Sequence, residues 1–149
     1  METGQYTLYQ TLKSIFLHID NHEKALLGKF DLSVARFYTL MHIHNHPGIN
    51  YIDLSDLMLC TKSNTTRVVS SMQADGYIER RDHPDDGRSY QLYLTDKGEG
   101  LFLQVQPRFL AHIDHLMSSF DDAQLKDYTA ASKHIERVVA PDIIVGGSK

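Results

Sequence analysis

Residues 54–98 read LSDLMLCTKSNTTRVVSSMQADGYIERRDHPDDGRSYQLYLTDKG, and this stretch decides the fold. Its first half carries apolar residues at the spacing of two short amphipathic helices, and Gly76 can end the second helix. The apolar period then changes from 3.6 to 2, which predicts antiparallel strands at residues 77–81 and 90–94. Asp86-Gly87 is a hairpin-turn signal between the strands, because glycine readily adopts a positive φ.

Further helices are predicted on both sides of this stretch. Residues 6–27 carry apolar side chains at helical spacing, and Gly28 can end that helix. A second helix is predicted from its cap Ser33 to about Asn45. A long helix after the hairpin contains Pro107, which should bend it or interrupt its hydrogen bonds. The other predicted N-caps are Asn50, paired with Asp53, then Thr61, Thr95 and Asp121, which forms a capping box with Gln124.

The terminal helices are too apolar for the outside of a small monomer, so we expect them to form a dimerisation lobe built from both ends of the chain. The fold class is therefore mainly α with a small β-hairpin wing: a winged helix-turn-helix plus a helical dimerisation lobe. The side chains expected to be buried in the third and last helices are Leu54, Leu57, Met58, Leu125, Tyr128, Ile135 and Val138.

Composition places the chain among ordinary soluble proteins of about one domain, with 149 residues, 42% hydrophobic and 23% charged. No apolar run is long enough for a transmembrane helix, and the N-terminus lacks the pattern of a secretory signal. The single cysteine, Cys60, excludes an internal disulfide and fits a cytoplasmic location. The net charge of −4 argues against a strongly basic, histone-like grip on nucleic acid, so any DNA affinity is expected to be modest and salt-sensitive.

One face of the fourth helix carries polar side chains that suit a DNA major groove. Ser63, Arg67 and Ser70 fall at i, i+4 and i+7, with Asn64 and Thr66 beside them. Arginine can bind guanine, asparagine can bind adenine, and the threonine methyl can contact thymine, whereas Lys62 would hold phosphate. The alternative for such a face is a simple solvated surface.

The hairpin favours the DNA interpretation. Its tip carries Arg88 where a wing could enter a minor groove. Asp86 lies two residues earlier and can aim Arg88 through an ion pair that adds only about 0–1 kcal/mol of stability.

With these residues, the chain resembles the MarR family of bacterial transcription regulators. The matching signature is Asp86-x-Arg88 followed by residues 94–98, Leu-Thr-Asp-Lys-Gly, with Thr66-Arg67 before it. The resemblance implies a homodimer with two winged-helix lobes on a pseudo-palindromic operator. It implies a repressor whose Arg67 reads the major groove and whose Arg88 enters the minor groove.

The resemblance also implies how the chain is organised. Residues 1–149 would form one MarR-like domain, with a winged-helix lobe at 30–98 and dimerisation helices at 6–28 and 99–140. Two departures stand out: Gly87 replaces a frequent basic residue of the wing, and Arg36 replaces a frequent Gln or Glu.

The resemblance further implies that DNA is released when a small aromatic or phenolic acid binds between the two lobes. Arg36 could then pair with a carboxylate, and Tyr38 or a histidine could hold a hydroxyl. The alternative is that the candidate residues simply pack the subunit junction. The candidates are His18, His22, Arg36, Tyr38, His42, Phe109 and His112.

Other functions are less well supported by the sequence. Histidine pairs one turn apart, such as His18 with His22 and His42 with His46, could make a metal-responsive regulator, but no cysteine or glutamate cluster completes a ligand set. Cys60 is expected to be a small buried hydrophobe rather than a redox switch. Neither a nucleophile elbow nor a glycine-rich phosphate loop is present, so no enzyme and no cofactor are predicted. A winged helix used only for protein contacts is the remaining alternative.

Overall fold

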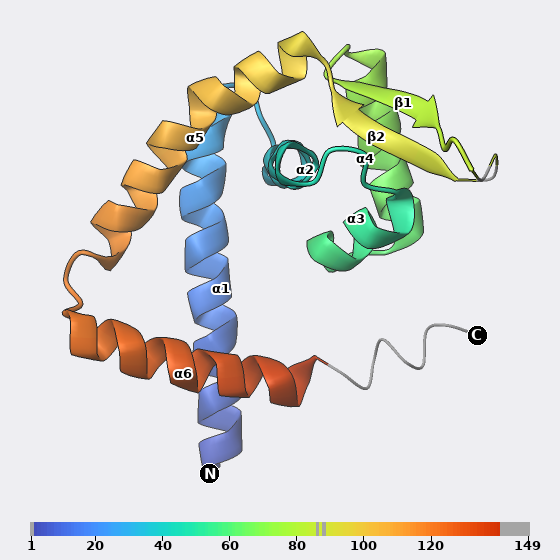
Figure 1. Ribbon diagram of the computed structural model, residues 1–149. Coiled ribbons are helices and arrows are strands. Elements are labelled where there is room, and N and C mark those ends of the chain that lie inside the picture. Colours follow the sequence, from blue (N-terminus) through green and yellow to red (C-terminus); the bar gives the residue numbers. More distant parts are fainter. Residues whose placement is uncertain (1, 86, 88, 141–149) are drawn as a thin grey trace. The chain divides into compact units, whose positions relative to one another are not determined.

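The computed structural model describes residues 2–85, 87 and 89–140, and it confirms the mainly helical fold with one β-hairpin (Figure 1). The described residues up to Phe109 form one compact unit, and those from Leu110 onward form another. No helix of the described residues is long and apolar enough to cross a membrane. The elements are α1 (Gly4–Gly28), α2 (Val34–Asn45), α3 (Tyr51–Met58), α4 (Lys62–Ala74), β1 (Ile78–Asp82), β2 (Tyr90–Leu94), α5 (Asp96–Met117) and α6 (Asp122–Val139).

The helix starts follow from local capping chemistry, as the sequence predicts. The side chains of Ser33, Asn50, Thr61 and Asp121 each accept a hydrogen bond from the backbone amide three residues later. Gln124 completes the capping box of α6 by accepting from the Asp121 amide. The Thr95 hydroxyl accepts from the backbone amide of Gly98 at 3.1 Å, and α5 then continues through Pro107 without ending.

The wing consists of two antiparallel strands. Ile78 pairs with Leu94 and Asp82 with Tyr90, so β1 begins one residue later than the alternation predicts. The sequence did not predict an additional bridge, in which Ile49 pairs with Leu92 and ties the α2–α3 loop to β2. Asp86 and Arg88 lie outside the described residues.

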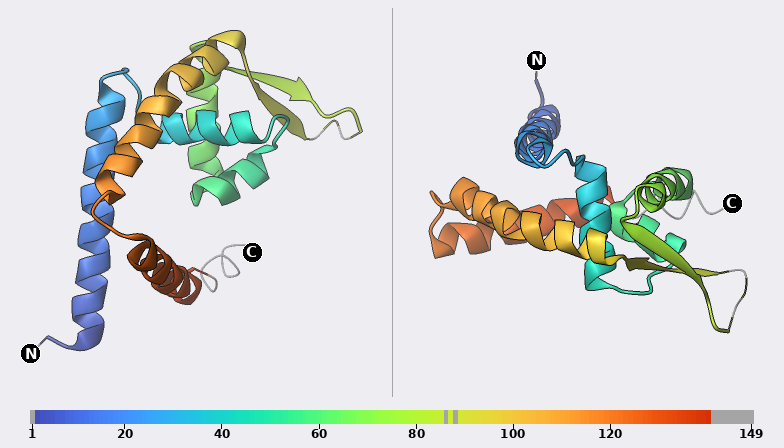
Figure 2. Two further views of the ribbon diagram at one scale, coloured as in Figure 1. Left: turned by 60° about the vertical axis from the view of Figure 1, so that its left-hand side comes forward. Right: turned by 90° about the horizontal axis from the view of Figure 1, so that it is seen from above.

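The core of the first unit lies where α2, α3 and α4 meet the hairpin and the first half of α5 (Figure 2). Phe37 is 1% exposed, and its ring centroid lies 6.0 Å from that of Phe102 and 4.5 Å from that of Phe109. Gly98 permits a close approach of backbones, since a Cβ atom there would lie 2.1 Å from the carbonyl oxygen of Tyr77. The start of α5 is thereby held against the end of the helix-turn-helix.

Several apolar side chains that were expected to be buried are exposed in the single chain. Tyr128 is 50% and Val138 70% exposed, and no residue of α6 is buried. Leu57 of α3 is also exposed, at 43%. Apolar periodicity predicts which face of a helix is covered, but it does not say whether the covering surface belongs to the same chain. The remaining expected positions divide into Leu54, which is buried, Met58 and Ile135, which are half-buried, and Leu125, which is exposed.

Candidate nucleic-acid interface and adjoining cavity

Helix α4 separates a buried side from an exposed polar side. Thr65, Val69 and Met72 are fully buried, which fixes the rotation of the helix about its axis. The opposite face consists of the six side chains that the sequence singled out, and all of them are exposed: Lys62, Ser63, Asn64, Thr66, Arg67 and Ser70.

The N-terminal end of α4 is fixed by a small buried polar network. The Ser55 hydroxyl lies 2.9 Å from the Thr65 hydroxyl, which joins α3 to α4. Between these helices, Leu59 adopts the left-handed conformation with φ 52°, so the chain turns tightly. Cys60 is half-buried rather than buried, and its Sγ lies 3.0 Å from Thr65 Oγ1.

The C-terminal end of α4 is fixed by Arg36 from α2. Its Nη2 atom donates to Asp75 Oδ2 at 2.6 Å and to Ser71 Oγ at 2.5 Å. The sequence assigned Arg36 to a ligand carboxylate, but in the fold its guanidinium has the carboxylate of Asp75 as its partner. Sequence spacing cannot reveal a partner 39 residues away.

Two side chains of the exposed α4 face contact each other. Arg67 Nη2 donates to Asn64 Oδ1 at 2.9 Å. This bond holds the arginine head over the first turns of α4, where the backbone amides also favour an anion such as phosphate.

Cations also line the wing. The guanidinium of Arg80 lies 4.1 Å from the ring centroid of Tyr90, and that of Arg81 lies 4.0 Å from the centroid of Tyr93. Arg81 also pairs with Glu79. Both arginines are exposed, so the aromatic rings hold two positive charges on the surface of the hairpin.

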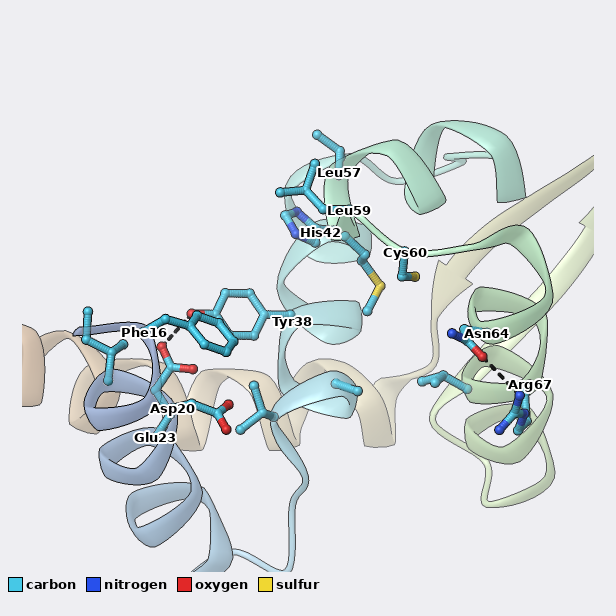
Figure 3. A pocket seen from close by; sticks show the side chains of 15 residues that line it. Phe16, Asp20, Glu23, Tyr38, His42, Leu57, Leu59, Cys60, Asn64 and Arg67 are labelled. Carbon is cyan, nitrogen blue, oxygen red and sulfur yellow. Dashed lines mark hydrogen bonds between the residues drawn. The ribbon is translucent and has the colours of Figure 1, made fainter. Parts of the chain in front are cut away.

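A cavity of about 860 Å³ adjoins α4 within the first unit (Figure 3). It is lined by side chains of α1, α2, α3, α4 and the α3–α4 turn, and most of them are apolar. The lining residues are Phe16, Ile19, Asp20, Glu23, Val34, Ala35, Tyr38, His42, Leu57, Met58, Leu59, Cys60, Asn64, Arg67 and Val68.

Only Tyr38 and His42 of the seven predicted ligand residues line this cavity. Phe109 is instead a core residue, 6% exposed. His18 and His22 lie on α1 but are not among the lining residues, and His112 belongs to the second unit. Sequence reasoning missed Phe16, Asp20 and Glu23, although their i, i+4, i+7 spacing places them on one face of α1.

Two polar groups of the cavity, Tyr38 and His42, favour their neutral forms. The Tyr38 hydroxyl donates to Glu23 Oε1 at 2.6 Å. Burial raises the pKa of Tyr38, and the hydrogen bond to Glu23 and the charges of Glu23 and Asp20 raise it further. Burial, followed by the charge of His46, lowers the pKa of His42, which favours the neutral imidazole. Within the described part of the chain, no three His, Cys, Asp or Glu side chains gather as a metal site would require.

Together, a helix pair with an exposed polar second helix and a two-stranded wing define a winged helix-turn-helix DNA-binding protein. The family model for the MarR family matches residues 32–90. The chain is 31% identical over 103 residues to the HTH-type transcriptional regulator BilQ of Clostridium symbiosum (strain WAL-14163), covering 69% of this chain and 72% of that protein. BilQ of Clostridioides difficile (strain CD3) is 28% identical over 123 residues, covering 80% of this chain and 83% of that protein. The chain belongs to the MarR family and is a transcription regulator, not an enzyme.

Solved structures share the fold. A MarR protein from Peptoclostridium difficile superposes with a TM-score of 0.83 at 20% identity, covering 93% of this chain and 91% of that one. FabT of Streptococcus pneumoniae, solved in complex with DNA, superposes with a TM-score of 0.76 at 20% identity, covering 89% of this chain and 95% of that one. PcaV of Streptomyces coelicolor, solved with its natural ligand, superposes with a TM-score of 0.72 at 15% identity, covering 83% of this chain and 89% of that one.

Proposed function

We propose that this regulator is a homodimeric repressor that binds a pseudo-palindromic operator and releases it when a small molecule occupies the cavity beside α4. The observation that carries the proposal is the division of α4 into a fully buried side and an exposed polar side. Such a helix would present the exposed Asn64, Thr66 and Arg67 to a major groove while the buried residues hold its axis fixed. The wing would contact the adjoining minor groove through Arg88, braced by Asp86.

DNA recognition is tested by fluorescence anisotropy. The labelled duplex would be an inverted repeat from the promoter next to the gene, and the competitor a scrambled duplex of the same length. Arg67→Ala should cost about 1–3 kcal/mol of discrimination between the two duplexes, because a bidentate contact to a base is lost. Arg88→Ala should weaken binding to both duplexes by more similar factors. If the parent and Arg67→Ala prefer the inverted repeat over the scrambled duplex by the same factor, α4 is not the helix that recognises the bases.

The control for this experiment is Lys126→Ala, which removes a positive charge from an exposed position on α6. It should bind both duplexes as the parent does, once the salt concentration is matched. A similar loss in Lys126→Ala and Arg67→Ala would mean that only the net charge matters.

The homodimer is supported by the uncovered apolar surfaces of the terminal helices. Tyr9 of α1 is 67% exposed, and Tyr128 and Val138 of α6 are likewise exposed. Light scattering should give a mass of two chains. The double variant Tyr128→Glu/Val138→Glu should shift the mass toward one chain, whereas Lys133→Glu at an exposed position of the same helix should not.

Ligand release is supported by the composition of the cavity wall. A mostly apolar chamber with a few polar groups is typical of a small-molecule site, and an aromatic or phenolic ligand is the class that the family resemblance implies. Asn64 and Arg67 line this chamber and also lie on the α4 face. Occupancy would therefore act on the proposed DNA-reading side chains, provided that the ligand binds the free form more tightly. A promoter–reporter fusion distinguishes repression from activation, since deletion of the gene should raise expression.

A further inference from the structure

The side of the cavity that is built from α1 and α2 is acidic and aromatic. Asp20 and Glu23 line it together with the rings of Phe16 and Tyr38 (Figure 3). Both carboxylates lie close enough to the Tyr38 hydroxyl to raise its pKa, so the two acids and the phenol share one small region. Figure 3 shows Asn64 and Arg67 apart from this region, on α4.

The negative charge of this region is only partly compensated. Asp20 pairs with Lys24 at 2.7 Å, but the Lys24 side chain is 64% exposed and is not among the lining residues. Glu23 accepts a hydrogen bond from the neutral Tyr38 hydroxyl, which does not offset its charge. Among the described residues that line the cavity there is no lysine, and Arg67 is the one arginine.

An anionic ligand would meet a penalty at this end. The charges of Glu23 and Asp20 already disfavour the ionised form of Tyr38, and a carboxylate or phenolate placed beside them would be disfavoured for the same reason. Arg36, the obvious counter-charge in the sequence, is occupied by Asp75. The two carboxylates therefore disfavour binding of the aromatic acid that the family resemblance implies.

We propose that the cavity takes an organic cation, a protonated amine on an aromatic or other apolar body, with the ammonium held by Asp20 and Glu23. This inference rests on the proposed role of the cavity as the ligand site. An ammonium can donate charge-assisted hydrogen bonds to both carboxylates while the faces of Phe16 and Tyr38 attract the same charge. His42 adds no opposing charge, because burial favours its neutral form.

The remainder of the chamber suits the apolar body of such a ligand. Met58 from α3 and Val68 from α4 line it, and methionine adapts readily to flat aromatic surfaces. A ligand anchored at Glu23 and extending along these side chains would approach Arg67 with its apolar end, which would also disfavour the exposed, hydrated position of that guanidinium.

The experiment compares two probes with the same ring system and opposite charge, 2-naphthylmethylammonium and 2-naphthoate, by calorimetry on the full-length protein without DNA. The parent should bind the ammonium probe at least about tenfold more tightly than naphthoate. The ammonium gains charged hydrogen bonds to two carboxylates, whereas naphthoate is repelled by them. Glu23→Gln should weaken binding of the ammonium probe about tenfold and leave binding of naphthoate unchanged or make it tighter. Gln can still accept from Tyr38, so folding should be retained.

A matched control is Asp127→Asn, which removes one carboxylate from an exposed position on α6 and should leave both affinities unchanged. Tighter binding of naphthoate than of the ammonium, binding of neither probe, or an equal effect of Glu23→Gln and Asp127→Asn would each overturn the proposal. These outcomes leave operator binding unaffected, so they are distinguishable from failure of the DNA-binding function, which is measured without any probe.

Discussion

Arg36 joins the first turn of α2 to the last turn of α4 by donating to Asp75 at 2.6 Å and to Ser71 at 2.5 Å. The Arg36 side chain is 24% exposed, so water screens this contact less than it screens a pair on the open surface. Thr65 fixes the other end of α4 through Ser55. The direction of the helix is thus set at both ends by polar contacts and between them by the packing of Val69 and Met72.

The first prediction concerns this contact. Arg36→Met keeps the apolar stem but removes both hydrogen bonds, so the free energy of unfolding should fall by about 1 kcal/mol. Urea unfolding at one protein concentration measures the change. Arg108→Met, at an exposed position of α5, should change it by less than about 0.5 kcal/mol. Equal effects of the two substitutions would mean that the Arg36 contacts add nothing to stability.

The second prediction tests the close approach at the start of α5. In Gly98→Ala the new methyl group would lie 2.1 Å from the Tyr77 carbonyl oxygen, and the backbone must move to admit it. Unfolding should become easier by about 1–3 kcal/mol. Gly100→Ala on the same helix meets nothing within 4 Å and should be neutral or stabilising by up to about 1 kcal/mol, because alanine favours the helix. Thermal unfolding should show a lower melting temperature for Gly98→Ala and an unchanged or higher one for Gly100→Ala; a similar decrease in both would contradict this role of Gly98.

The third prediction compares two neighbouring threonines of α4. Thr65→Val preserves shape but deletes the buried hydroxyl that contacts Ser55 and Cys60, so it should cost about 1–2 kcal/mol of unfolding free energy. Thr66→Val deletes an exposed hydroxyl that donates to the Lys62 carbonyl, and it should cost less than about 0.5 kcal/mol. Equal losses would contradict the role of the buried network.

These contacts also show where sequence reasoning stops. Capping is a property of residues three apart, so Ser33, Asn50, Thr61 and Asp121 could be assigned from the sequence and are confirmed. The polar face of α4 follows from helical spacing in the same way. Bonds between distant segments, such as that of Arg36 with Asp75, carry no periodic signal, so the sequence could not reveal this partner of Arg36.

The cavity, too, could be predicted only in part from the sequence. Tyr38 and His42 were predicted to line a ligand site, and they do line the cavity. The acidic residues of α1 were missed because charged side chains on a helix are usually a solvated face. Only the packing of α1 against α2 brings Glu23 within 2.6 Å of the Tyr38 hydroxyl.

The last prediction concerns pH. Because burial and His46 lower the pKa of His42 below its ordinary value of 6.5, the folded chain takes up a proton at this residue less readily than the unfolded chain does. The stability associated with the neutral imidazole is therefore complete above about pH 6.5 and is lost as the pH falls through the lower folded value. His42→Gln removes the titrating group, so the decline in unfolding free energy between about pH 7.5 and 5.5 should be shallower than in the parent. Urea unfolding at several pH values and a fixed protein concentration measures both slopes, and parallel slopes would show that His42 does not couple protonation to folding.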